Sequence, residues 1–128
     1  MATKVESTVE IESWDEQPID DASPKVTRAS VVAHVSGGIE GTSRTEYVMA
    51  YRDDGSAVYT GIERIAGTVD GREGTLVLRH IGAYEDGAAR SAVEVVGSSG
   101  SDGLAAVRGA GDFVAVLSPS MRLDLTFD

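Results

Sequence analysis

The stretch SGGIEGTSRTEYVMAYRDDGSAVYTGIERIAGTVDGREGTLVLRH, residues 36–80, alternates apolar and polar side chains with a period of two residues. Alternation over this length is typical of β-strands that bury one face. The stretch contains two Asp-Gly pairs, at Asp54-Gly55 and Asp70-Gly71, and Asp-Gly between alternating runs is a strong hairpin signal. It therefore predicts three consecutive antiparallel strands, over residues 40–52, 56–69 and 75–84.

The same alternation continues on both sides of this stretch. Residues 4–12 and 25–36 predict two strands before it, and residues 88–96, 111–117 and 121–127 predict three strands after it. Asp86-Gly87 supplies a further hairpin turn, and residues 14–24, with their two prolines, predict a surface loop. Residues 104–108 predict one short helical turn. The chain thus predicts eight strands joined mostly by hairpins.

Eight antiparallel strands with one apolar face must either stack as two sheets or close on themselves. Glycines inside the predicted strands, such as Gly61, Gly67 and Gly82, permit the strong coiling of a small barrel. We therefore predict an all-β, eight-stranded antiparallel β-barrel, a calyx of lipocalin-like shape, with a sandwich as the alternative. A chain of 128 residues suits one domain, so residues 1–128 are expected to form a single barrel domain.

The charge balance excludes several classes of partner. The net charge is -10, from 21 acidic and 11 basic residues, whereas proteins that bind nucleic acid or anionic membranes present clustered Lys and Arg. No apolar run is long enough to span a membrane, and the N-terminal residues do not resemble a signal peptide. The sequence predicts a cytoplasmic protein that binds neither nucleic acid nor membrane.

The residue inventory also argues against metal and cofactor chemistry. The absence of cysteine excludes disulfides, thiolate nucleophiles and cysteine-ligated metal centres. The two histidines, His34 and His80, fall on different predicted strands, and no metal-ligand spacing surrounds them. The Gly-Ser-rich residues 97–103 lack the Gly-Lys-Ser/Thr ending of a phosphate-binding loop. We predict no metal and no cofactor.

Two polar residues fall on faces that are otherwise apolar. In the strand at 56–69, Glu63 shares the odd-numbered face with Tyr59, and in the strand at 75–84, His80 shares a face with Leu78. If these faces point inward, neighbouring strands bring Glu63 and His80 within reach of each other or of a common ligand. Such a pair suits general acid–base catalysis, so both residues are candidate catalytic groups. Alternatively, Glu63 bonds an arginine or the backbone, and His80 only satisfies a buried polar group.

The inward faces also predict a ligand-binding wall. Its candidate residues are Tyr47, Met49, Tyr51, Tyr59 and Leu78. Buried tyrosine hydroxyls need partners, and tyrosines in pockets often orient ligands. Simple core packing explains the same residues equally well. Trp14 is expected to act as a lid or an oligomer contact.

Four spaced motifs carry a resemblance that covers nearly the whole chain. They are GIEGTS at 38–43, YVMAYRDDGSAVYTGIER at 47–64, GTVDGREGTLVLRH at 67–80 and SSGSDGLAAVRGAG at 98–111. Together they resemble a bacterial family of small proteins of unknown function with an allene oxide cyclase-like barrel, and residues 100–109 resemble a turn of plant dirigent proteins. Leu76 and Val93 stand where that family tends to carry Phe and Trp, which predicts a wider interior.

The resemblance implies a calyx for an apolar small molecule, since characterised relatives steer cyclisation of oxidised lipids or coupling of aromatic radicals. It also implies a homo-oligomer, a dimer or trimer, which outward-facing Val58 and Ile62 would suit.

Three functions follow from this reading. The first is a binding barrel with an apolar, Tyr-lined cavity. The second is a cyclase or isomerase that shapes a flexible apolar substrate, oxylipin or polyketide-like, with Glu63 and His80 as proton-transfer groups. The third is a structural oligomer with a filled core.

Overall fold

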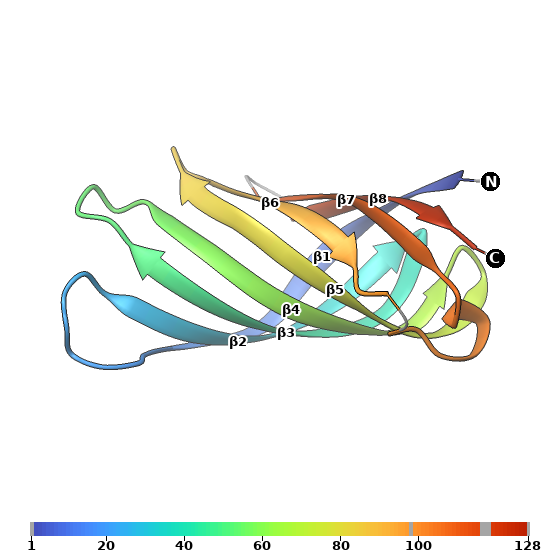
Figure 1. Ribbon diagram of the computed structural model, residues 1–128, viewed down its shortest axis with the longest axis horizontal. Helices are drawn as coiled ribbons and strands as arrows, with labels where there is room; N and C mark the ends of the chain where they lie inside the picture. Colours follow the sequence, from blue (N-terminus) through green and yellow to red (C-terminus); the bar gives the residue numbers. More distant parts are fainter. Residues whose placement is uncertain (1, 98, 116–118, 128) are drawn as a thin grey trace.

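The computed structural model describes residues 2–97, 99–115 and 119–127, which fold as a closed barrel of eight antiparallel strands (Figure 1). The strands are β1 (Ala2–Pro18), β2 (Val26–Gly37), β3 (Ile39–Tyr51), β4 (Ala57–Val69), β5 (Arg72–Glu85), β6 (Ala88–Val95), β7 (Arg108–Ala115) and β8 (Ser120–Thr126). Each strand pairs with its neighbour in sequence, and β8 closes the barrel on β1. The predicted antiparallel barrel is confirmed, and the sandwich is not formed.

Tight turns fix the register of the central strands. Asp70 and Gly71 both have positive φ, 50° and 78°, and Asp86 and Gly87 repeat this pattern at 53° and 78°. Positive φ at both central residues is the type I′ geometry that matches the twist of paired strands. At the β3–β4 turn, only Gly55 has positive φ, and the connection is correspondingly longer.

The first strand is longer than the sequence pattern predicts. Residues 14–18 belong to β1, and the loop comprises only residues 19–25. The predicted loop over residues 14–24 was therefore wrong in its first part. The reason is a β-bulge between Ile11 and Ser13, which lets β1 continue along β2 after the alternation in the sequence is interrupted.

The two ends of the barrel differ (Figure 1). One end is packed, with a core of aliphatic side chains that includes Ile65, Leu76 and Leu123. The connection between β6 and β7 covers this end, and its Leu104 and Val107 are almost fully buried in the same core. The connections β1–β2, β3–β4 and β5–β6 lie at the opposite end.

The β6–β7 connection approaches the barrel closely. A Cβ on Gly74 of β5 would lie 2.2 Å from the carbonyl oxygen of Ser101, so only glycine leaves room for it there. The helical turn is a 3-10 helix at Asp102–Leu104, slightly before the predicted residues 104–108, and β7 begins at Arg108 rather than at residue 111. The predicted end of that strand, at residues 116–117, lies outside the described residues.

The outer wall carries apolar side chains on β3, β4 and β5. Val58 and Ile62 point outward as expected, with exposures of 41% and 50%, and Val48 and Ile81 are exposed beside Thr60. The expected homo-oligomer stays a prediction. Among the described residues, no helix is long and apolar enough to cross a membrane.

Candidate functional site

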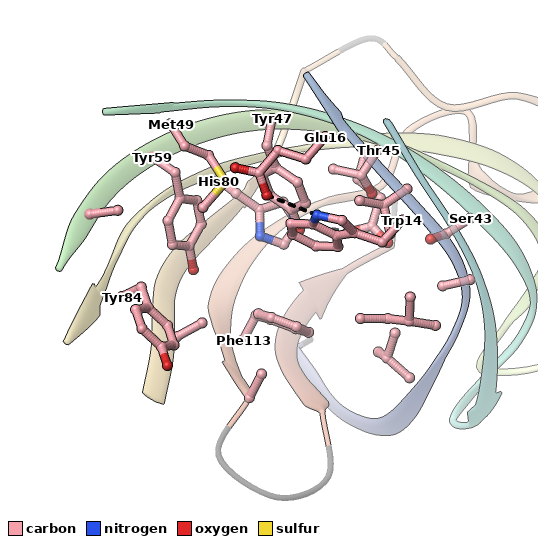
Figure 2. A pocket seen from close by; sticks show the side chains of 18 of the residues that line it. Trp14, Glu16, Ser43, Thr45, Tyr47, Met49, Tyr59, His80, Tyr84 and Phe113 are labelled. Atoms are coloured by element: carbon pink, nitrogen blue, oxygen red, sulfur yellow. Dashed lines mark hydrogen bonds and ion pairs between the residues drawn. The ribbon is translucent and has the colours of Figure 1, made fainter. Parts of the chain in front are cut away.

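The half of the barrel opposite the packed end encloses a cavity of about 340 Å³ (Figure 2). Seven strands, β1 to β7, contribute to its wall. The lining side chains are those of Val9, Ile11, Trp14, Glu16, Val31, Ala33, Ser43, Thr45, Tyr47, Met49, Tyr51, Ala57, Tyr59, Glu63, His80, Tyr84, Ala89, Phe113 and Ala115. The volume lies at the lower end of the range of about 300–1,000 Å³ that is usual for small-molecule sites.

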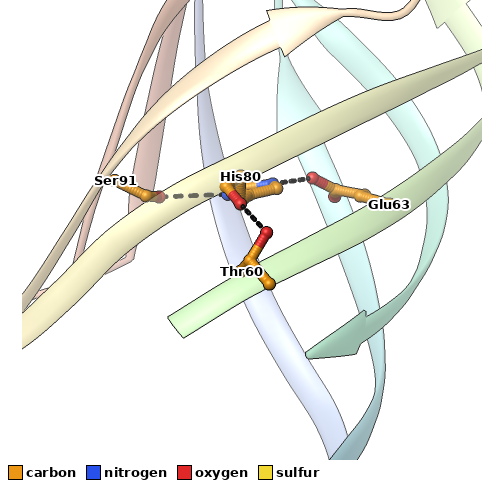
Figure 3. Close-up of polar contacts among 4 residues, drawn as sticks. All are labelled: Thr60, Glu63, His80 and Ser91. Atoms are coloured by element: carbon orange, nitrogen blue, oxygen red, sulfur yellow. Dashed lines mark hydrogen bonds and ion pairs between the residues drawn. The ribbon is translucent and has the colours of Figure 1, made fainter. Parts of the chain in front are cut away.

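Glu63 and His80 meet at the wall of this cavity (Figure 3). Glu63 on β4 lies opposite Leu78 of β5, so His80, two residues further along β5, projects from the same inner face. His80 Nε2 lies 2.7 Å from Glu63 Oε1, and His80 Nδ1 lies 3.0 Å from the hydroxyl oxygen of Ser91 on β6. The two side chains predicted as catalytic groups are therefore in direct contact, and both residues are almost fully buried.

Both ring nitrogens of His80 are satisfied without a positive charge on the ring. In the Nε2–H tautomer, His80 donates to the Glu63 carboxylate and accepts a hydrogen bond from the Ser91 hydroxyl at Nδ1. The backbone carbonyl of His80 accepts a further bond from Thr60, which ties β5 to β4. Such a carboxylate–imidazole–hydroxyl chain can hold a proton at either end of the imidazole, which is the basic requirement of acid–base chemistry.

The Tyr59 hydroxyl is buried without a hydrogen-bond partner. Tyr59 is 7% exposed, and its hydroxyl oxygen is the one buried side-chain polar atom without a partner in the part of the chain that the structure describes. Burial raises the pKa of this hydroxyl, and the neighbouring Ser91 hydroxyl partly offsets the increase. Unpaired buried polar groups in proteins are rare and often lie at functional sites.

An aromatic cluster surrounds the Glu63–His80 pair. The Tyr47 ring packs edge-on against Tyr59, with centroids 5.4 Å apart, and edge-on against His80 at 5.7 Å. Gly61 makes this packing possible, because a Cβ there would lie 2.4 Å from Tyr47 Cδ1. Burial raises the pKa of the Tyr47 hydroxyl strongly, and the negative charge of Glu63 adds to the effect. Tyr47 is therefore a neutral phenol at ordinary pH.

Trp14 and Glu16 belong to the cavity although the sequence pattern placed them in a loop. Before the bulge, odd-numbered residues of β1 such as Val9 face inward. After the bulge, the even-numbered residues face inward, because Trp14 and Glu16 lie opposite the buried Val31 and Ala29 of β2. Trp14 stacks on Tyr47 with ring centroids 6.0 Å apart. A one-residue insertion exchanges the two faces of a strand, and no turn residue in the sequence marks this one.

Glu16 organises the entrance to the cavity. Its carboxylate accepts hydrogen bonds from Trp14 Nε1 at 3.0 Å, from Thr27 Oγ1 at 2.7 Å and from the Tyr51 hydroxyl. Burial alone would raise the pKa of Glu16, but these three hydrogen bonds and the charge of Lys25 lower it below its ordinary value. Glu16 is thus ionised at neutral pH and fixes the positions of two aromatic rings.

The structure separates the predicted ligand wall into two groups. Tyr47, Met49, Tyr51 and Tyr59 line the cavity, whereas Leu78 points inward into the packed core and is not part of the cavity wall. Leu76 and Val93, whose small size predicted a wider interior, also lie in that core and not beside the cavity. Leu104 and Val107 of the β6–β7 connection are buried in the same core and help to fill the space there.

The histidines do not form a metal site. His34 is exposed on the outer face of β2, away from the inward-facing His80. Within the described ranges, no group of three or more His, Cys, Asp or Glu side chains is placed to hold a metal ion.

Comparison with known proteins gives a family but no activity. A family model described as "Protein of unknown function (DUF3224)" matches residues 5–127. A crystal structure from Shewanella oneidensis, described as a protein with unknown function from the DUF3224 family, is similar with a TM-score of 0.82 at 25% sequence identity; the match covers 100% of this chain and 99% of that one. No curated protein matches the chain.

Proposed function

Because the chain belongs to the DUF3224 family, whose function is unknown, we propose from the site itself that the protein is a small-molecule-binding β-barrel. Its ligand is a largely apolar molecule that carries a polar group. The observation that carries this proposal is the hollow half of the barrel, a cavity of about 340 Å³ lined mostly by aromatic and aliphatic side chains.

A barrel with a purely structural role gains stability from a filled interior, because cavities cost packing energy. Eight strands are just wide enough either to be filled by side chains or to hold one small ligand. In this chain the packed half is filled mainly by large aliphatic residues, whereas the small residues Ala57 and Ala89 line the other half. The unpartnered Tyr59 hydroxyl supports the same conclusion, since a ligand can relieve its lack of a hydrogen bond.

The test is ligand binding by a variant with a blocked cavity. Ala89→Leu adds volume to the cavity wall from β6, and Ala92→Leu adds the same volume to the outer face of the same strand. We expect the wild type and Ala92→Leu to bind a neutral, apolar two-ring dye such as Prodan, with a change in the fluorescence of Trp14, the chain's single tryptophan. Ala89→Leu should bind at least about tenfold more weakly, since a ligand site must match the volume of its occupant.

Equal dye binding by both variants would place the dye outside the barrel. Native mass spectrometry of the purified protein gives an independent measurement, because a ligand retained from the host adds a discrete mass. Absence of dye binding together with absence of any retained or added ligand would favour a structural barrel.

A second candidate function is a cyclase or isomerase acting on a flexible apolar substrate. The chain of hydrogen bonds from Glu63 through His80 to Ser91 at the cavity wall favours it, because such a chain can donate and accept protons beside a bound molecule. Glu63→Gln separates the two functions. Retained binding with loss of turnover on a candidate substrate would support catalysis, whereas unchanged turnover would assign Glu63 a structural role.

We also propose that the family is related to allene oxide cyclase-like barrels. The closed eight-stranded topology and the short helical turn at Asp102–Leu104 support the relation. Superposition on a solved allene oxide cyclase tests this relation. We expect the same strand order, with the β6–β7 connection covering the same end of the barrel, and a different strand order would contradict the relation.

A further inference from the structure

We propose that the cavity takes a cationic ligand of about two rings, an aromatic or alicyclic molecule with a protonated amine, and rejects carboxylates. The inference rests on the proposed binding function and specifies its ligand class. It follows from three independent features: the charge at the open end of the barrel, the charge inside the cavity, and the chemistry of the cavity wall.

The end of the barrel opposite the packed end, where the exposed lining residues Trp14 and Tyr84 mark the mouth of the cavity, is called the open end and is acidic. The connections β1–β2, β3–β4 and β5–β6, with the last residue of β5, bring together Asp20, Asp21, Asp53, Asp54, Glu85 and Asp86. All of these residues are exposed, and the only basic residues in the same segments are Lys25 and Arg52. Charge of one sign around an opening attracts ligands of the opposite sign and repels those of the same sign. This end therefore favours the entry of cations.

The interior has the same sign. Glu16 and Glu63 line the cavity, and none of the described residues that line it is Lys or Arg. His80 is the one lining residue that could carry a positive charge, and its ring is held between the Glu63 carboxylate and the Ser91 hydroxyl rather than directed at the open space. Glu63 is almost fully buried and its carboxylate contacts the His80 ring, so a ligand ammonium group beside this pair would add a favourable charge interaction in a site of low polarity. A ligand carboxylate would instead add a further negative charge.

The wall presents aromatic rings and one unpaired oxygen. Trp14, Tyr47 and Tyr59 form a continuous aromatic surface, and aromatic faces attract cations. A cation already stacks at the entrance, where Lys25 Nζ lies 4.4 Å from the ring centroid of Tyr51. The Tyr59 hydroxyl, which is buried without a partner, can accept a hydrogen bond from an ammonium group.

The volume limits the size of the ligand. An apolar protein cavity of about 150 Å³ takes one benzene ring. The cavity of about 340 Å³ is roughly twice that size, which suits a two-ring molecule and leaves too little room for a long acyl chain.

The test uses three ligands of one shape and different charge: 1-naphthylmethylamine, 1-naphthalenemethanol and 1-naphthoate. Their affinities for the full-length protein are measured by isothermal titration calorimetry at pH 7.5. We expect the amine to bind at least about tenfold more tightly than the alcohol, as expected for a desolvated cation on aromatic faces. The carboxylate should bind more weakly than the alcohol.

Variants assign the preference to named charges. Glu63→Gln, which keeps the size of the side chain and a hydrogen-bonding group toward His80, should reduce the ratio of amine to alcohol affinity by about tenfold. Should this buried variant fail to fold, Asp53→Asn with Asp86→Asn tests the entrance, and the amine affinity should fall and depend less on salt. Asn tolerates the positive φ of Asp86, and Glu73→Gln, exposed near the packed end, is the matched control that should change nothing.

The outcomes distinguish the two proposals. Equal affinities for all three ligands, or tightest binding of the carboxylate, would overturn the cationic ligand class and leave the binding function standing. Absence of binding by all three, together with a negative result in the dye experiment, would overturn both.

Discussion

Replacing Tyr59 by phenylalanine is expected to stabilise the ligand-free protein. The side chain is 7% exposed, and its hydroxyl has no hydrogen-bond partner among the described residues. A buried unpaired polar group costs roughly 1–3 kcal/mol relative to its solvated state. Tyr59→Phe removes that cost and keeps the ring that packs on Tyr47. Because the Ser91 hydroxyl partly offsets the effect of burial on the pKa of Tyr59, we expect the lower end of that range, a gain of about 1 kcal/mol.

The assay is urea unfolding at neutral pH, followed by circular dichroism and by Trp14 fluorescence. The midpoint should rise with no change in the slope m, and the melting temperature should rise by about 3–5 °C. Tyr51→Phe is the matched control, because the Tyr51 hydroxyl donates to Glu16. This control should lose about 1.5–3 kcal/mol, as expected for a hydrogen bond to a charged group.

A loss of more than about 1 kcal/mol in Tyr59→Phe would refute the reasoning, because such a loss means that the hydroxyl is hydrogen-bonded in solution. The same variant should weaken the binding of a ligand that uses this hydroxyl. A gain in stability together with a loss of affinity is a combination that a residue with a purely structural role does not produce.

Three further predictions concern other parts of the barrel. Gly61→Ala would place a Cβ 2.4 Å from the Tyr47 ring, so it should destabilise the fold by about 1–3 kcal/mol in urea unfolding, and an unchanged midpoint would show that the ring moves freely. Leu104→Ala, at a residue of the packed end that is 1% exposed, should lower the free energy of unfolding by about 2–5 kcal/mol. A loss below about 1 kcal/mol would mean that Leu104 contributes little to the packing of this end. The pKa of Glu16 is lower in the folded protein than its ordinary value of 4.5, so the ionised side chain stabilises the fold above pH 4.5. This stabilisation is lost as the pH falls through the lowered pKa. Glu16→Gln should therefore make the free energy of unfolding less dependent on pH in that acid range.

The sequence pattern predicted the centre of the barrel because local rules agree there. Asp70-Gly71 forms the tight turn that its composition predicts, and this turn fixes the register of β4 against β5. With the register fixed, the period of two residues places Tyr59, Glu63 and His80 on the inner face. The contact between Glu63 and His80 follows from these two constraints alone.

The site at the entrance could not be predicted in the same way. Its position depends on the bulge between Ile11 and Ser13, which exchanges the inner and outer faces of β1. Trp14 and Glu16 reach the cavity only because of this exchange. The distinction between a lining residue and a packed one, as for Leu78, depends on depth along the barrel, and alternation carries no information about depth.

The second half of β1 has a further consequence for the protein in concentrated solution. β8 pairs with β1 over residues 2–8, and among the described residues the later stretch from Ser13 to Pro18 is hydrogen-bonded to β2 and pairs with no strand on its other side. Such a free edge can pair with the same edge of another molecule and start aggregation. The stretch carries Asp15, follows directly on the bulge and on the acidic Glu10 and Glu12, and ends in proline, and each of these features opposes edge-to-edge pairing. The end of β1 thus combines a free backbone edge with acidic residues that disfavour the addition of a strand from a neighbouring molecule.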